Sequence, residues 1–150
     1  MSPHRSSLAL FVFLLLCFVD LAPAGATGTV RIQQYDGTVR VYDDAVIRVK
    51  HNTLRVWSHD GKGTLVIDRA ACSYVGELER CLPTTFQLKQ NGATRTIQLV
   101  NGLVYFNPTN SVQQLSLSSR QLQPRGLMLN LHTVRGTYIS IRGTIDELAP

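Results

Sequence analysis

The stretch Leu127-Met-Leu-Asn-Leu-His-Thr-Val-Arg-Gly-Thr-Tyr-Ile-Ser-Ile-Arg142 decides how this chain folds. Leucine occupies every second position at its start, and isoleucine alternates with other residues after the pair Arg135-Gly136. Alternation with a period of two places one set of side chains on each face of a strand. Glycine accepts the positive φ that tight turns require. The stretch therefore predicts a β-hairpin with one apolar face.

The same alternation recurs toward the N-terminus, between pairs of turn-forming residues. We expect strands at residues 29–33, 38–42, 45–50, 53–57, 64–68, 84–89, 94–100 and 103–106. We expect turns at Asp36-Gly37, Asp43-Asp44, His51-Asn52, residues 60–63, Asn91-Gly92 and Asn101-Gly102. The polar segment 111–123 fits one edge strand and a loop. The best helix candidate, residues 74–80, is too short to be stable alone. The chain therefore predicts one all-β domain, an antiparallel sandwich or small barrel (a jelly roll included) of about 9–11 short strands.

The first 26 residues have the pattern of a secretory signal peptide. A basic start precedes an apolar run from Leu8 to Val19, and small residues follow at positions 22–26. The run is shorter than the roughly 20 apolar residues that a membrane-spanning helix needs. We therefore expect cleavage near residues 24–26 and a single exported domain, residues 27–150, in the periplasm or outside the cell. An uncleaved membrane anchor is the alternative.

The cysteines fit an exported protein. Cys17 lies in the apolar leader, so Cys72 and Cys81 are the two that the mature chain keeps. Two cysteines about ten residues apart in an exported chain indicate a disulfide, which in the chain-entropy model contributes about 3 kcal/mol. Redox catalysis and zinc binding are the weaker alternatives, because the spacing is not Cys-x-x-Cys and no histidine pair accompanies it. We expect a rigid, disulfide-closed loop first and a recognition loop second.

Signatures of catalysis are missing from the sequence. It contains no Gly-x-Ser-x-Gly, no His-Glu-x-x-His and no phosphate-binding glycine loop. His51, His59 and His132 are expected to be turn or surface residues, and Asp146-Glu147 to solvate the tail. We therefore expect no enzyme activity, no catalytic residues, no cofactor and no metal.

Basic residues are the most informative polar feature. Lysine and arginine number 15 against 10 acidic residues, a formal net charge of +5. The cations expected to point outward on four successive strands, with the tryptophan of the same parity, are Arg31, Arg40, Arg48, Lys50, Arg55 and Trp57. If these strands pair in order, they form a ladder of positive charge that an anionic partner would stabilise. A solvated sheet face is the alternative, and nucleic acid is not expected because the aromatic residues do not interleave with the arginines.

Three motifs carry a resemblance. Cys72-x8-Cys81-Leu82-Pro83, Tyr105-Phe106-Asn107-Pro108-Thr109 and Arg135-Gly136-Thr137-Tyr138-x-Ser140-x-x-Gly143-Thr144-Ile145-Asp146 together resemble small exported bacterial proteins of uncharacterised function. This likeness covers the second half of the mature chain and implies no activity. Separately, the strand pair within residues 45–68 is similar to repeating strand pairs of periplasmic lipopolysaccharide-transport jelly rolls.

These observations favour an exported, non-enzymatic β-module that binds an anionic envelope component through its arginine-rich face. The expected partner is a lipid headgroup, lipopolysaccharide, an acidic polysaccharide or another envelope protein. A structural or assembly protein that works by strand addition or oligomerisation is the first alternative. The second is an enzyme whose site is assembled from scattered histidine and aspartate residues.

Overall fold

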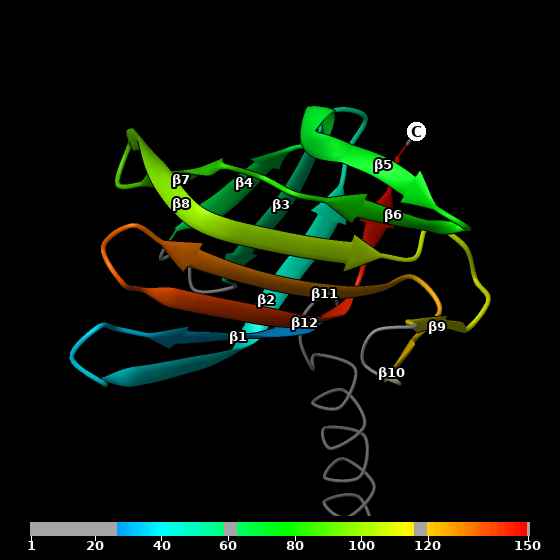
Figure 1. The fold of residues 1–150 in the computed structure, drawn as a ribbon, viewed down its shortest axis with the longest axis horizontal. Helices are drawn as coiled ribbons and strands as arrows, with labels where there is room; N and C mark the ends of the chain where they lie inside the picture. Colours follow the sequence, from blue (N-terminus) through cyan, green and yellow to red (C-terminus); the bar gives the residue numbers. More distant parts are fainter. Residues whose placement is uncertain (1–26, 59–62, 116–119, 150) are drawn as a thin grey trace, which may run out of the picture.

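Eight antiparallel strands close into a barrel in the computed structural model, which describes residues 27–58, 63–115 and 120–149 (Figure 1). The barrel strands are β1 (Gly28–Gln33), β2 (Val39–Val49), β3 (Thr53–Ser58), β4 (Thr64–Asp68), β7 (Thr85–Gln90), β8 (Ala93–Phe106), β11 (Gly126–Thr133) and β12 (Tyr138–Thr144). Their order is β11-β12-β1-β2-β3-β4-β7-β8, and β8 pairs again with β11. The all-β expectation is confirmed in its barrel form. The expected signal peptide at residues 1–26 lies outside the described residues, as does His59.

The hairpin predicted from residues 127–142 closes the barrel. Leu129 pairs with Ile141 and Leu131 with Ile139, and all four side chains are buried. Gly136, at φ +90°, donates its N–H to the carbonyl of Thr133 in the turn. The opposite edge of β11 pairs with β8, so this hairpin joins the two ends of the sheet.

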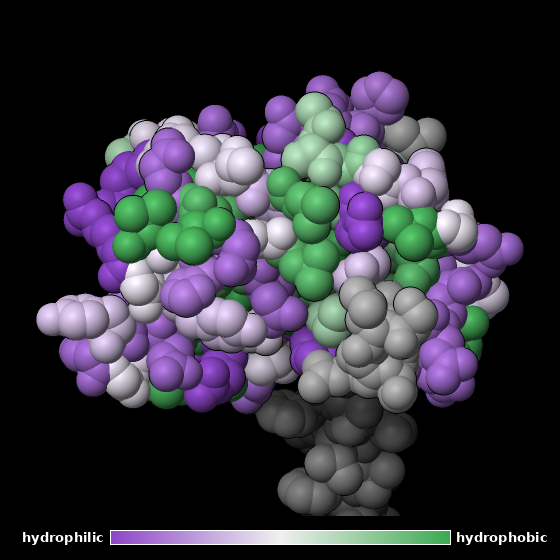
Figure 2. Space-filling view, in the orientation of Figure 1, coloured by the Kyte–Doolittle hydropathy of each residue, from purple (hydrophilic) through white to green (hydrophobic). Residues whose placement is uncertain are grey.

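Apolar side chains fill the barrel interior. The large residues buried almost completely include Ile47, Leu54, Phe106 and Leu129, and each such burial contributes about 1.5–3 kcal/mol. A second apolar cluster lies outside the wall over β8 and β11, where green atoms gather in Figure 2. It comprises Leu78, Tyr105, Leu122 and Met128. Leu122 belongs to the hairpin of β9 (Gln113–Leu115) and β10 (Arg120–Leu122).

The predicted disulfide-closed segment is a β-hairpin, and the short helix considered for residues 74–80 is not formed. The short 3-10 helix η1 (Arg69–Ala71) leads into β5 (Cys72–Val75), and β6 (Leu78–Cys81) returns to pair with β8. Gly76, at φ +63°, forms the two-residue turn with Glu77. Cys72 and Cys81 lie directly opposite each other and form the predicted disulfide, with an S–S distance of 1.90 Å.

Two predicted turns are wrong, because one strand continues through each of them. Asp43-Asp44 lies inside β2, where that strand has one residue more than β1 between consecutive pairs. Such an extra residue is a β-bulge, which bends a strand without ending it. Asn101-Gly102 lies inside β8, and a Cβ atom on Gly102 would be 3.0 Å from the carbonyl oxygen of Pro83. That glycine serves a close approach of two backbones and not a turn.

A short strand near the C-terminus extends the same sheet beside the second half of β2. β13 (Glu147–Leu148) runs parallel to β2 and pairs with Arg48 and Val49. The N–H of Asp146 donates to the carbonyl of Ile47 at 2.7 Å, and that of Ala149 donates to Val49 at 2.8 Å. Within the described ranges, no helix is long and apolar enough to cross a membrane.

Candidate anion-binding groove

A shallow groove of about 570 Å³ lies on the outer face of β2, β3 and β4. Its lining residues, which define the cationic groove, are Arg48, Lys50, Asn52, Thr53, Arg55, Trp57 and Thr64. The volume falls within the usual range of small-ligand sites. Four of the six residues that the sequence proposed for anion contact therefore lie together.

The strand register explains why these residues gather. Arg48 lies directly opposite Arg55, and Trp57 lies directly opposite Thr64. Directly opposite residues point to the same face of an antiparallel pair. Ile47 and Val49, the neighbours of Arg48, are fully buried in the core, so the arginine itself points outward.

The other two proposed cations lie elsewhere, which corrects the expected ladder. Arg40 is paired with Ile32, a residue that packs against the core, so Arg40 shares the inner face of the sheet. The bulge in β2 reverses the alternation between Arg40 and Arg48. Arg31 is on the outer face, opposite Val41, but Arg48 is seven positions beyond Val41 in β2, roughly 20 Å along the strand. Arg40 and Arg48 also share one strand, so the cations occupy three strands and not four.

Aromatic and acidic neighbours moderate the charge of Arg48. Its guanidinium carbon lies 4.9 Å from the centre of the Trp57 ring, a cation–π distance. Its Nε atom lies 3.5 Å from carboxylate oxygens of both Asp146 and Glu147. Two arginines directly opposite each other repel, and these contacts offset part of that repulsion. The expectation that Asp146 and Glu147 only solvate the tail is therefore wrong.

Glu147 also reaches Lys50. The Lys50 ammonium donates to a Glu147 oxygen at 2.9 Å, and this hydrogen bond holds the pKa of the Glu147 carboxyl below its usual range. Both side chains are partly exposed, so the pair contributes little to stability by itself. The Lys50–Glu147 ion pair neutralises part of the positive charge beside the groove.

Arg55 is the cation best placed to receive a ligand. Its Nε donates to the Thr53 hydroxyl at 3.4 Å, and it has no ion pair with any carboxylate in the described part of the chain. Among the described residues, no carboxylate neutralises the Arg55 guanidinium, and Arg55 lines the groove together with Thr53 and Thr64. Arginine offers two parallel donors, which match a phosphate or carboxylate.

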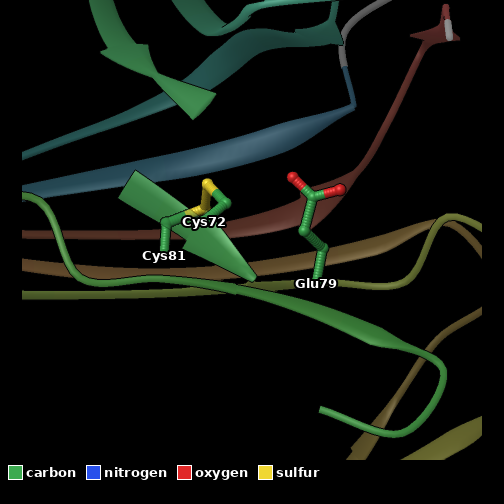
Figure 3. Close-up of side chains that lie close together, drawn as sticks. All are labelled: Cys72, Glu79 and Cys81. Carbon is green, nitrogen blue, oxygen red and sulfur yellow. A yellow bond between two sulfur atoms is a disulfide. The ribbon is translucent and has the colours of Figure 1, made fainter. Parts of the chain in front are cut away.

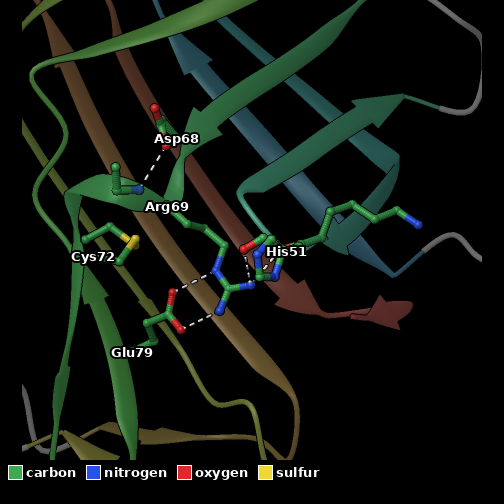
Figure 4. The surroundings of a disulfide bond; sticks show 8 residues. His51, Asp68, Arg69, Cys72 and Glu79 are labelled. Atoms are coloured by element: carbon green, nitrogen blue, oxygen red, sulfur yellow. Dashed lines mark hydrogen bonds and ion pairs between the residues drawn. A yellow bond between two sulfur atoms is a disulfide. The ribbon is translucent and has the colours of Figure 1, made fainter. Parts of the chain in front are cut away.

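A buried ion pair fixes the cysteine hairpin beside this region (Figure 4). Arg69 donates from Nε and Nη2 to the two Glu79 oxygens at 2.9 and 2.7 Å. Its Nη1 donates to the backbone carbonyl of Lys50 at 2.6 Å. The hydrogen bonds that Arg69 donates to Glu79 raise the pKa of the Arg69 guanidinium. No local sequence pattern indicates this pair, because Arg69 and Glu79 come together only through the fold.

The disulfide and Glu79 form a compact group with the composition of a metal site. Ligand atoms of Cys72, Glu79 and Cys81 lie within 4.8 Å of one another (Figure 3). Both sulfur atoms are used by the disulfide, and Arg69 uses both oxygens of Glu79. The group is therefore structural in the oxidised protein.

The described histidines do not join the groove lining. His51 is exposed in the β2–β3 turn, and His132 is exposed on β11, 6.0 Å from the Tyr138 ring centre. Their surface positions agree with the sequence expectation.

Comparison with known proteins gives no functional information, so the functional argument rests on the groove. No protein family, no curated protein and no solved structure matches this chain.

Proposed function

We propose that the protein is an exported, non-enzymatic binding module that holds an anionic group of the cell envelope in the cationic groove. The observation that carries this proposal is the convergence of Arg48, Arg55 and Trp57 on one hollowed face of the barrel. Phosphate and carboxylate groups of lipid headgroups, lipopolysaccharide or acidic polysaccharides have the charge and the acceptors that such a site recognises. The disulfide is compatible with export, since such bonds persist in oxidising compartments.

The groove has features that a solvated sheet face does not need. Val46 lies directly opposite Trp57, and Val66 directly opposite Arg55, so both valines point to the outer face. They are nevertheless only 4% and 6% exposed. The indole ring supplies an apolar surface on which a sugar ring or an acyl-linked headgroup can lie, beside donors for its charged substituents.

Direct binding measurements test this function. We expect the purified chain to bind phosphatidylglycerol vesicles, lipopolysaccharide or an acidic polysaccharide, and to ignore phosphatidylcholine vesicles. Arg55→Ala should weaken that binding about tenfold or more, because a hydrogen bond to a charged group contributes about 1.5–3 kcal/mol. The fluorescence of Trp57, the one tryptophan in the chain, should change on binding.

The matched control is Arg31→Ala, which removes the same charge from an exposed position outside the groove. We expect it to bind within about twofold of the original protein. If both variants bind equally well and the Trp57 emission stays unchanged, the groove is not the binding site.

A further inference from the structure

Among the described residues, the first half of β2, from Val39 to Val41, is an edge of the barrel sheet. β2 pairs with β1 from Val39 onward, but its pairing with β3 begins only at Ala45. Within the described ranges, no strand pairs with the far side of Val39 and Val41. Figure 1 shows this part of β2 as the outermost strand below β1.

Every second residue on this edge directs its backbone N–H and C=O groups away from β1. Gln34 donates its N–H to the carbonyl of Thr38 at 2.8 Å. In an antiparallel ladder, hydrogen-bonded pairs alternate with non-hydrogen-bonded pairs, so Arg40 is hydrogen-bonded to β1 and Val39 and Val41 are not. The N–H and C=O groups of these two valines therefore face away from β1, as a template for another strand.

The side chains of the edge favour a second copy of the same segment. Val39 and Val41 are 42% and 54% exposed, which is unusual for neighbouring β-branched residues on one face. A positive charge at Arg40 precedes the acidic pair Asp43-Asp44. In an antiparallel pair of identical strands, the basic end of each lies beside the acidic end of the other.

We propose that two copies of this chain associate by antiparallel pairing of their β2 edges about a two-fold axis at Val41. Residues whose backbone N–H and C=O groups point away from β1 must pair with the same kind of residue in the second copy. The two-fold axis therefore passes through a residue and not between two residues. An axis at Arg40 would place the two arginines directly opposite each other, which is unfavourable. The axis at Val41 instead pairs each Arg40 with the partner's Tyr42, and brings the two exposed Val41 side chains together. The contact is short, so the dimer is weak and concentration-dependent.

Sedimentation of the purified chain over a range of concentrations tests this interface, which is separate from the cationic groove. We expect a dimer fraction that rises with concentration. Val41→Lys should raise the dissociation constant at least about tenfold, since it places two like charges at the axis. Val134→Lys, an equal change at a valine 63% exposed on the β11–β12 turn, should stay within about twofold.

Hydrogen exchange provides a second test that needs no substitution. The amides of Val39 and Val41 should exchange more slowly as the protein concentration rises, while that of Arg40, already bonded to β1, should not change. A monomer at every concentration would overturn the proposal. A dimer that Val41→Lys leaves intact, with no concentration effect at these amides, would overturn it as well.

Discussion

A single buried ion pair, Arg69–Glu79, makes the sharpest prediction at the scale of the residue. Glu79 is 4% exposed, and both of its oxygens accept hydrogen bonds from Arg69. Arg69→Met removes the partner and leaves a buried carboxylate uncompensated, which typically costs about 3–5 kcal/mol. We expect chemical denaturation to show a loss of that size in the free energy of unfolding.

The double variant Arg69→Met/Glu79→Leu is the matched control. Replacing both partners of a buried ion pair by apolar residues is often close to neutral, so it should recover most of the lost stability. An Arg69→Met protein as stable as the original would mean that the ion pair is not formed in solution.

The same scale shows why only part of the groove could be predicted. Alternation correctly predicts that Arg48, Arg55 and Trp57 lie on the outer face, because the pairing of β2 with β3 and of β3 with β4 has no register shift. Arg40 was misplaced because one extra residue in β2 reverses the alternation before Arg48. The acidic residues that contact Arg48 come from the far end of the chain, and local patterns cannot reveal such a pairing.

At the scale of the element, a pair of substitutions in β8 tests whether the Asn101-Gly102 pair is needed for a turn or for close packing. Gly102→Val would place a Cβ atom 2.9 Å from Pro83 Cγ and 3.0 Å from the Pro83 carbonyl oxygen. Overpacking of this kind typically costs about 1–3 kcal/mol. Asn101→Ala, at the exposed neighbouring position, should change the free energy of unfolding by no more than about 0.5 kcal/mol. Thermal or chemical unfolding of both variants measures the difference; equal losses would favour a turn at this pair.

The two Asn-Gly pairs of the sequence have different structures. Asn91 and Gly92, at φ +53° and +76°, form the predicted two-residue turn between β7 and β8. Asn101-Gly102 has the same sequence but lies where Pro83 packs against β8. A glycine in the sequence indicates that its position needs a small or conformationally flexible residue. It does not report whether the cause is a turn, a bulge or a close approach.

At the scale of the whole molecule, the barrel and the disulfide hairpin are separable sources of stability. The barrel is closed by β8–β11 pairing around one apolar core. The disulfide joins two directly opposite residues of one hairpin and does not cross the barrel. Its constraint therefore acts on the unfolded chain and on the hairpin, while the core holds the remaining strands.

The double variant Cys72→Ser/Cys81→Ser tests this separation. A loop of about ten residues accounts for about 3 kcal/mol in the chain-entropy model, so we expect a lower unfolding midpoint but a single cooperative transition. Hydrogen exchange should show faster amides in β5 and β6 and a much smaller change at the middle of β11. Cys81 is buried in the core cluster, but β6 pairs with β8 only at Val104 to Phe106 and does not pair with β11. Thiol titration of the unsubstituted folded protein should find no free thiol at either cysteine. If the variant instead loses protection throughout β8 and β11, the hairpin is required for the barrel to close, and the two sources of stability are one.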